Sequence, residues 1–412
     1  MKAVVFTLGC KVNDCESGSL MEGLNRLGWE VSDSLAYADL YILNTCAVTG
    51  EAEKKSRQAI ARIRKLNPAA RIIVCGCAAE KNPDAFGKKE NVTLITGARQ
   101  KGKILGLLSE EGVRIDEEDG VYDELLPPKT TKSRAFVKIQ DGCNNFCSYC
   151  IIPYLRGRSR SRGLESAARE ILESPAEEAV ITGIDISSYN DGGRGLADLL
   201  TAVRHADKRI RLGSLEVSAI TGPLLRAAVS VRDFAPHFHL SLQSGSAAVL
   251  RKMNRRYTPE EYAEKVRMIR SAFPSAAVTT DIIAGFPTET EEDFEESLAF
   301  AERMRFASVH CFPYSRRAGT VAAKLPDLPP EIKSDRLHRL LRLSERLRAE
   351  YAGGFVGKEL EFVPEEEADG YTVGYSENYI RLYVPGKIEK KTRVIAAEPY
   401  KDGLSARPAA AK

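Results

Sequence analysis

The stretch Cys143-Asn144-Asn145-Phe146-Cys147-Ser148-Tyr149-Cys150 carries three cysteines with the spacing C-x3-C-x2-C. It follows Ala135–Gln140, a short apolar run typical of a β-strand. Three thiolates on one loop can hold three irons of a four-iron, four-sulfur cluster and leave the fourth iron without a protein ligand. The amino and carboxylate groups of S-adenosylmethionine can occupy such an open position. One electron from the cluster then breaks a sulfonium C–S bond and releases a deoxyadenosyl radical.

A zinc site and a group of buried thiols are the two alternatives to such a cluster. Zinc requires a fourth cysteine or histidine close by, and the chain supplies none between this loop and Arg204. Three cysteines so close together in a loop after a strand do not fit a set of core residues. We therefore expect an iron–sulfur cluster at Cys143, Cys147 and Cys150.

Around this loop, residues 134–350 alternate strand-like and helix-like patterns. Six strand–helix units in tandem predict an α/β fold, an open and partial (β/α)6 barrel with its ligand-binding residues where the strands end. The expected strands are Ala135–Gln140, Ala179–Thr182, Ile210–Leu215, Phe238–Leu242, Ala277–Ala284 and Ala307–Phe312.

Polar residues and glycines follow these strands. Any one of the glycines could simply form a turn, but their repetition at every strand end favours cofactor contact. The residues expected to contact S-adenosylmethionine are Gly183, Asp185, Glu216, Gln243, Ser244 and Gly285.

Residues 1–125 read as a separate N-terminal domain, in which strands alternating with helices predict a doubly wound parallel sheet. Three short strands are followed by Cys10, Cys46 and Cys77. Because parallel strands end at one edge of a sheet, these thiols can meet and hold a second cluster with one open iron. The alternative is that three strands end in cysteine by coincidence.

Three other cysteines are harder to assign. Cys75 and Cys77 are alternative candidates for the third ligand of the second cluster, because residues two apart in a strand share a face. Cys77 is preferred because it follows Gly76 at the strand end. Cys15 and Cys311 are expected to be thiols without a role in the chemistry. The acidic stretch Ser109–Leu125 is expected to be a linker.

Residues 355–399 contain short strand-like runs and predict a small β-barrel, with little room for five full strands. The terminal LSARPAAAK is expected to be loose. No Ser/His/Asp or Cys/His set suggests a catalytic side chain, and none is assigned.

The net charge of +3 means that RNA contact would depend on local basic patches. Arg156–Arg162, directly after the cysteine loop, is the favoured patch, whereas Arg251–Arg256 is expected to be solvated surface charge. The chain has no apolar run of roughly 20 residues and no signal peptide, so we expect a cytoplasmic protein without a membrane partner. Nine cysteines in such a compartment favour metal ligation over disulfides.

Over residues 1 to about 397 the chain resembles the radical-SAM methylthiotransferases. The segments that carry the resemblance are Thr7–Asn13, Asn44-Thr45-Cys46, Gly76-Cys77, Asp141-Gly142-Cys143, Cys147–Pro153, Arg156-Gly157-Arg158, Arg160-Ser161-Arg162, Gln243-Ser244-Gly245, Asp281–Pro287 and Pro313-Tyr314-Ser315. Leu8-Gly9-Cys10-Lys11-Val12-Asn13 is similar to the threonylcarbamoyladenosine tRNA branch. Gly370-Tyr371-Thr372 and Glu377-Asn378-Tyr379-Ile380 resemble the RNA-binding barrel called TRAM.

The resemblance implies two 4Fe–4S clusters and S-adenosylmethionine as cofactors, with Cys10, Cys46 and Cys77 holding the auxiliary cluster. It implies that this cluster carries the sulfur, that one S-adenosylmethionine methylates it, and that a second supplies the radical. The expected target is C2 of N6-threonylcarbamoyladenosine beside the tRNA anticodon. A reductant such as flavodoxin or ferredoxin would be a partner, and the sulfur donor is left open. The alternatives are isopentenyladenosine in tRNA, a ribosomal-protein aspartate, and a non-catalytic iron–sulfur protein that binds RNA.

Overall fold

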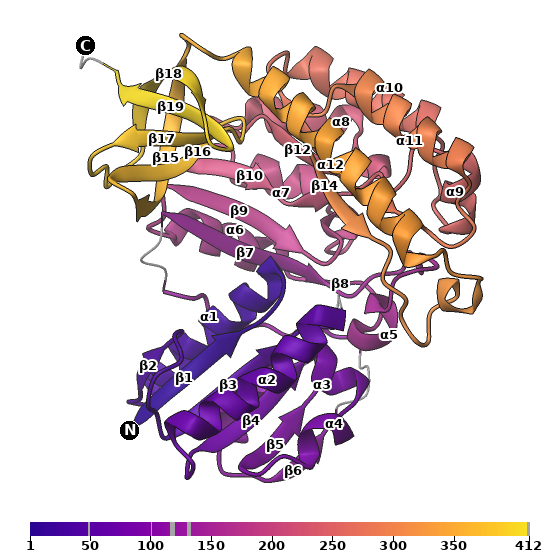
Figure 1. Cartoon of the computed structure of the whole chain (residues 1–412). Helices are drawn as coiled ribbons and strands as arrows, with labels where there is room; N and C mark the ends of the chain where they lie inside the picture. Colours follow the sequence, from indigo (N-terminus) through magenta and orange to yellow (C-terminus); the bar gives the residue numbers. More distant parts are fainter. Residues whose placement is uncertain (48–49, 100, 116–119, 130–132, 410–412) are drawn as a thin grey trace.

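The computed structural model describes residues 1–47, 50–99, 101–115, 120–129 and 133–409, and Figure 1 shows their arrangement. A parallel sheet forms the N-terminal part, an arc of parallel strands with outer helices forms the middle, and a small barrel follows. Within the described ranges, every helix is too short or too polar to cross a membrane. The α/β class and its three parts, predicted from the sequence, are confirmed.

The N-terminal sheet is doubly wound, as predicted. Its strand order is β2-β1-β3-β4-β5-β6, and all neighbouring pairs are parallel. Helix α1 buries Leu20 and Leu24 on one face of the sheet, and α2 buries Ile60 and Ile63 on the other. The strand order reverses between β1 and β3, the place where open sheets of this type bind ligands. The elements are β1 (Lys2–Thr7), α1 (Lys11–Arg26), β2 (Glu30–Ser32), β3 (Leu40–Thr45), α2 (Gly50–Leu66), β4 (Arg71–Gly76), α3 (Cys77–Lys81), α4 (Asp84–Gly87), β5 (Val92–Thr96), η1 (Lys101–Gly106) and β6 (Gly112–Arg114).

The expectation of a plain linker over Ser109–Leu125 is wrong in part. Residues Gly112–Arg114 form β6 and pair with β5 at the sheet edge. All three residues of β6 are exposed, so the strand depends on backbone hydrogen bonds and has no apolar pattern to reveal it. Further along, the Tyr122 hydroxyl donates to the backbone oxygen of Lys138 at 2.9 Å, which holds this segment against the barrel.

The central region forms the predicted open arc of parallel strands. Strands β7, β9 and β10 lie in one sheet and β11 to β14 in another, and only Gly213 separates β10 from β11. Alternate strand residues such as Ile139, Ile181 and Phe238 pack under the outer helices. The residues between them face the lumen. The elements are β7 (Arg134–Asp141), α5 (Ile152–Arg156), β8 (Arg160–Ser161), α6 (Leu164–Glu173), β9 (Glu178–Gly183), η2 (Ile186–Ser188), α7 (Leu196–Ala202), β10 (Arg209–Leu212), β11 (Ser214–Leu215), η3 (Val217–Ala219), α8 (Gly222–Ser230), β12 (His237–Leu240), α9 (Ala247–Lys252), α10 (Pro259–Ala272), β13 (Ala277–Ala284), α11 (Glu291–Met304), β14 (Ser308–Pro313), η4 (Ala322–Lys324) and α12 (Pro330–Gly353).

The C-terminal part is a closed barrel in the order β15-β16-β17-β19-β18. Its strands are β15 (Glu359–Ala368), β16 (Tyr371–Ser376), β17 (Arg381–Pro385), β18 (Thr392–Tyr400) and β19 (Gly403–Pro408). The expectation that the chain is loose from Leu404 onward is therefore wrong. Leu404 and Ala406 alternate into the barrel core, and the parallel pairing of β19 with β17 closes the barrel. Residues 355–399 are too few for five full strands, and the fifth strand, β19, is formed by residues beyond them.

Candidate active site between two cysteine sets

The loop that carries the first cysteine set is shaped by a tight turn. Gly142 has a φ of 71°, and a Cβ there would collide with the backbone oxygen of Arg158. The backbone N–H of Cys143 donates to the Gly157 oxygen at 3.1 Å, which closes the loop on itself. Cys143, Cys147 and Cys150 are half-buried free thiols at the ends of the barrel strands.

Hydrogen-bond donors point at the sulfurs of this loop. The Asn145 backbone N–H lies 3.4 Å from Cys143 Sγ, and Arg255 Nη1 lies 3.3 Å from Cys147 Sγ. Burial raises the pKa of Cys143 and of Cys150 to about 12, so these sulfurs would become thiolates only on binding a cation. Three thiols, two of them with N–H donors aimed at the sulfur, fit an iron–sulfur cluster.

Two of the six residues expected to bind S-adenosylmethionine lie against this loop. Asp185 Oδ2 accepts from Asn145 Nδ2 at 3.1 Å and lies 3.9 Å from Cys143 Sγ. Glu216 Oε2 accepts from Arg255 Nη2 at 2.6 Å. Burial raises the pKa of both carboxyl groups. They place acceptors next to the cysteine loop, where an amino group or sugar hydroxyls could be bound.

The other four shape the turns at the strand ends. Gly183 packs so closely on β7 that a Cβ would lie 2.9 Å from the Gln140 backbone oxygen. Gln243 has a φ of 72°, and its N–H donates to the Asp281 oxygen at 2.8 Å. The buried Ser244 hydroxyl pairs with that of Ser297 at 3.0 Å, and the Gly285 N–H donates to Glu289 Oε2 at 2.9 Å. Cofactor contact by these four residues stays a prediction.

Arg255 corrects one expectation from the sequence. The sequence pattern predicts that all of Arg251–Arg256 is solvated surface charge, but the Arg255 side chain is only 4% exposed. Besides Cys147 and Glu216, it donates to the Ser241 backbone oxygen at 2.9 Å. The pattern could not separate Arg255 from Arg251 and Arg256, which are exposed.

The second cysteine set lies at the switch point of the N-terminal sheet. Cys10 follows β1, Cys46 follows β3, and Cys77 begins α3 after β4. Gly9 packs so closely on Cys46 that a Cβ would lie 3.0 Å from its Sγ. Asn13 Nδ2 donates to the backbone oxygens of Leu8 at 2.9 Å and Thr45 at 3.1 Å, which ties the first two loops together.

Cys75 and Cys77 lie on opposite sides of the sheet, although a continuous strand would have placed them on one face. Cys75 packs with Val5, Leu20 and Leu24 under α1, whereas Cys77 packs on the α2 side. The cause is Gly76, whose φ of 96° ends the strand and turns the chain into α3. Of the two, Cys77 shares a side with the loops of Cys10 and Cys46, which favours it as the ligand.

A buried cluster of charges joins the two cysteine sets. Arg156, in the helix after the first cysteine loop, donates to Glu16 Oε1 at 2.8 Å and to Asp141 Oδ1 at 3.0 Å. Its Nη2 also donates to Asn13 Oδ1 at 2.8 Å. Lys138 Nζ bridges Glu16 and Asp141 at 2.8 and 2.7 Å. Burial alone would raise the pKa of Glu16, but Arg156, Lys101 and Lys138 together hold it well below its ordinary value.

These contacts correct the expectation that Arg156–Arg162 lines a route for RNA. Arg156, Arg160 and Arg162 are buried, and Arg162 is paired with Glu124 and Glu170. Arg158 is exposed, with its guanidinium 4.6 Å from the centre of the Phe146 ring. Of these arginines, Arg156 joins the N-terminal sheet to the barrel, whereas Arg160 and Arg162 contact the barrel and the segment that precedes it.

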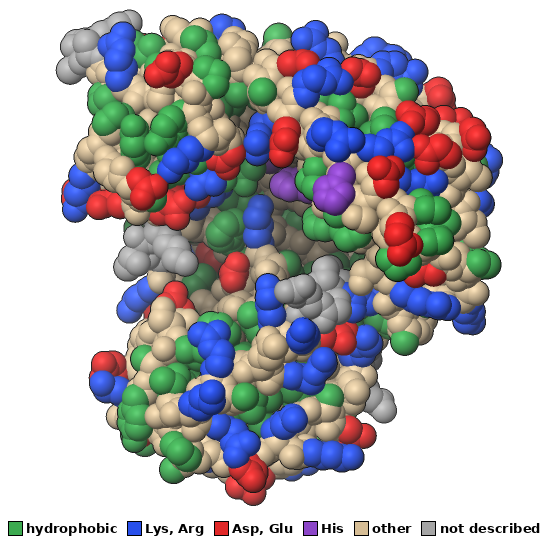
Figure 2. Space-filling model, in the orientation of Figure 1, with side chains coloured by type: hydrophobic (Ala, Val, Ile, Leu, Met, Phe, Trp, Pro, Cys, Tyr) green, Lys and Arg blue, Asp and Glu red, His purple; other side chains and the backbone are tan. Residues whose placement is uncertain are grey.

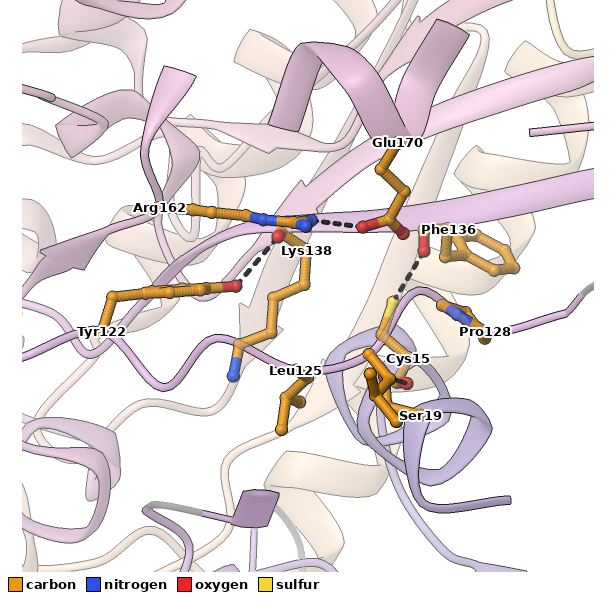
Figure 3. A pocket seen from close by; sticks show the side chains of 10 residues that line it. Cys15, Ser19, Tyr122, Leu125, Pro128, Phe136, Lys138, Arg162 and Glu170 are labelled. Atoms are coloured by element: carbon orange, nitrogen blue, oxygen red, sulfur yellow. Dashed lines mark hydrogen bonds and ion pairs between the residues drawn. The ribbon is translucent and has the colours of Figure 1, made fainter. Parts of the chain in front are cut away.

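Cys15 belongs to a small pocket at the same interface, shown in Figure 3. Its thiol donates to the Phe136 backbone oxygen at 3.2 Å, and burial raises its pKa well above the ordinary value. The pocket is closed by Tyr122, Lys138 and the Arg162–Glu170 pair. Its hydrogen bond and its place in the packing of this interface support the expectation that Cys15 has no role in the chemistry.

Comparison with known proteins supplies the family. Residues 2–97 match the family described as "Uncharacterized protein family UPF0004", and residues 137–301 match the radical SAM superfamily. The chain is 38% identical to the threonylcarbamoyladenosine tRNA methylthiotransferase MtaB of Bacillus subtilis, over 98% of this chain and 96% of that protein. The MtaB of Aquifex aeolicus is also 38% identical, over 96% of this chain and all of that protein.

The chain belongs to the MtaB-like radical-SAM methylthiotransferase family. A related member, the tRNA-2-methylthio-N(6)-dimethylallyladenosine synthase of Thermoanaerobacter sp., is 35% identical over 88% of this chain and 81% of that protein. Among solved structures, the radical S-adenosylmethionine methyltransferase TsrM from Kitasatospora setae aligns with a TM-score of 0.58 and 14% identity. That alignment covers 90% of this chain and 80% of TsrM, and it supports the fold alone.

Both cysteine sets could be predicted from the sequence, but the buried charged residues between them could not. Glu16 and Lys101 lie far apart in the chain and have no motif around them, although they form a buried ion pair. Lys138 in the middle of a strand was the available signal, because an isolated lysine in an apolar run needs a buried partner.

Proposed function

We propose that this protein is a radical-SAM tRNA methylthiotransferase that modifies C2 of N6-threonylcarbamoyladenosine beside the anticodon. The supporting observation is that the two cysteine sets belong to separate folding units joined by the buried Arg156 contacts to Glu16 and Asn13. Full-length relatives carrying this activity in their names support the substrate.

The proposal requires two 4Fe–4S clusters, one at Cys143, Cys147 and Cys150 and one at Cys10, Cys46 and Cys77. When bound, the first would supply the electron that cleaves S-adenosylmethionine, and the second would hold the sulfur that is transferred. Asp185 and Glu216 offer carboxylates to the amino and hydroxyl groups of S-adenosylmethionine. Arg255 offsets the negative charge of the ligated Cys147.

An anticodon-loop substrate suits an open site between the N-terminal sheet and the barrel. An adenosine in an anticodon loop is unpaired, so it can be splayed into a cavity without breaking a duplex. Figure 2 shows a hollow between the N-terminal sheet and the rest of the molecule. The exposed Lys387 and Lys390 of the C-terminal barrel offer cations to RNA phosphates. A flavodoxin- or ferredoxin-like reductant would deliver electrons.

Mass spectrometry of tRNA nucleosides tests this function, in a host without its own enzyme and with or without this gene. The expected product is 2-methylthio-N6-threonylcarbamoyladenosine. Because one relative is named a tRNA-2-methylthio-N(6)-dimethylallyladenosine synthase, methylthio-isopentenyladenosine (the same dimethylallyl nucleoside) is the competing product, and its appearance would overturn the substrate assignment. Failure of the reconstituted protein to release deoxyadenosine would instead indicate a non-catalytic iron–sulfur protein.

A further inference from the structure

Three polar side chains from neighbouring strands meet on the lumen side of the barrel, apart from the cysteine loops. His239 of β12 lies with its Nε2 3.2 Å from Asp281 Oδ2 of β13. His310 of β14 lies beside it, with 5.4 Å between the ring centres. One ligand atom from each of the three side chains lies within 4.8 Å of the others. His310 is exposed, and Figure 2 shows histidine side chains at the hollow between the two parts of the molecule.

Arg255 links the end of β12 to the first cysteine set. Ser241, two residues after His239 on the same side of the strand, accepts from Arg255, the residue that contacts Cys147. Two strand residues span roughly 7 Å, so His239 lies about that far along the chain from Ser241, which Arg255 joins to the first cysteine loop.

Lys11 connects the same group to the second cysteine set. Lys11 directly follows Cys10, and its ammonium lies 5.8 Å from the centre of the lumen-facing Phe136 ring. Burial, the His239 ring and the Lys11 ammonium hold the pKa of His310 below its ordinary value. Phe136 lies on β7 and His310 on β14, the strands at the two ends of the parallel arc, so the Lys11 ammonium lies on the β7 side of the lumen.

We propose that His310 and Lys11, with His239 and Asp281, bind the threonyl carboxylate and hydroxyl of the target nucleoside and so set substrate specificity. This inference rests on the proposed function and names the residues of that same site which recognise the substituent on N6. Lys11 supplies a positive charge for the carboxylate, and the His310 ring supplies an N–H donor. Asp281, which already accepts from His239, has a further oxygen for the hydroxyl.

The same arrangement disfavours two other ligands for this group, an isopentenyl substituent and a metal ion. An isopentenyl group has no polar atom, so it would cover Lys11, His310 and Asp281 without replacing their hydrogen bonds to water. A site built to hydrogen-bond a polar substituent strongly rejects an analogue that lacks it. A metal ion would face the Lys11 ammonium. It would also displace the contacts of both His239 nitrogens, because Nδ1 lies 3.0 Å from Thr279 Oγ1.

The test measures binding of anticodon stem-loops to the reconstituted protein by fluorescence anisotropy. The four probes carry threonylcarbamoyladenosine, its uncharged threonine-amide analogue, isopentenyladenosine or plain adenosine. The natural acid should bind tightest. His310→Leu and Lys11→Met should each weaken its binding by about tenfold or more and leave plain adenosine unaffected. His338→Leu, on the exposed face of α12, is the matched control and should change none of the four affinities.

The iron content and the cluster absorption spectrum of His310→Leu and Lys11→Met should match those of the wild type, which would exclude damage to either cysteine set. Equal binding of the acid and the amide by the wild type, or an unchanged preference in both variants, would overturn the inference. A stoichiometric third metal that is lost in His239→Leu would overturn it as well. Failure of the wild type to form any methylthio product would count against the proposed function alone, because the binding measurements stand without turnover.

Discussion

Arg156 Nη2 donates to Asn13 Oδ1 at 2.8 Å, a contact that links the residues just after both cysteine sets. Arg156 follows the loop of Cys143, Cys147 and Cys150, and Asn13 follows Cys10. Both side chains are buried, and Asn13 in turn holds the loops of Cys10 and Cys46. Arg156, together with the Lys138–Glu16 ion pair, therefore holds the N-terminal sheet against the barrel.

Replacing Glu16 by Gln should destabilise this junction. The change leaves Arg156 and Lys138 with one buried carboxylate, that of Asp141, in place of two, and it removes the carboxylate that pairs with Lys101. Breaking a buried ion pair on one side costs about 3–5 kcal/mol. Calorimetry should show a lower melting temperature and an N-terminal sheet that unfolds separately from the barrel.

Glu350→Gln serves as the control for that experiment, because Glu350 pairs with Arg346 on an exposed helix face at 3.0 Å. Such surface pairs contribute about 0–1 kcal/mol. Equal destabilisation by both changes would show that the buried cluster does not hold the junction.

Cys75 and Cys77 should differ sharply in their effect on catalysis. Cys77→Ala should abolish methylthio transfer and leave S-adenosylmethionine cleavage measurable, because it removes a ligand of the second cluster only. Cys75→Ala should retain both activities, since this thiol is packed in the core under α1. Assays of deoxyadenosine and of methylthio product on each variant provide the comparison, and loss of transfer in Cys75→Ala with retention in Cys77→Ala would reverse the assignment.

Arg255 should tune the first cluster without holding it. Arg255→Gln removes a donor 3.3 Å from Cys147 Sγ and the partner of Glu216. Loss of such an outer contact typically costs about 10–100-fold in activity. The cluster potential, followed by electron paramagnetic resonance during reductive titration, should fall because hydrogen bonds to sulfur stabilise the reduced state. Arg251→Gln, an exposed neighbour, should leave rate and potential unchanged.

His237 should make stability depend on pH below neutrality. Burial, together with Arg211 and His239, holds its pKa well below the ordinary value, and its ring stacks on Tyr379 with 4.3 Å between centres. Below about pH 6.5 the unfolded chain binds a proton here and the folded chain does not. Stability is thus retained above that pH and falls by up to about 1.4 kcal/mol per unit below it.

His237→Phe keeps the stacked ring and removes the titration, so its melting temperature should fall less than that of the wild type between pH 7 and pH 5.5. His338→Phe, which is exposed, should follow the wild type. Parallel pH profiles for wild type and His237→Phe would show that this ring does not contribute.

Much of this fold could be predicted from sequence because short continuous apolar runs mark buried strands such as β3, whose six residues are all buried. Edge strands such as β6 could not be predicted, because their exposed side chains leave no apolar pattern in the sequence. Spacing alone could not separate Cys75 from Cys77, because the decision depends on the positive φ of Gly76. The partners of Glu16 come from three distant segments, and no local pattern brings them together.

Iron content, measured on anaerobically reconstituted protein, tests the central claim most directly. Two three-cysteine sites predict about eight irons per chain. Each triple variant, Cys10→Ala/Cys46→Ala/Cys77→Ala or Cys143→Ala/Cys147→Ala/Cys150→Ala, should retain about four. A wild-type chain with only four irons, or a triple variant that keeps all eight, would contradict the account.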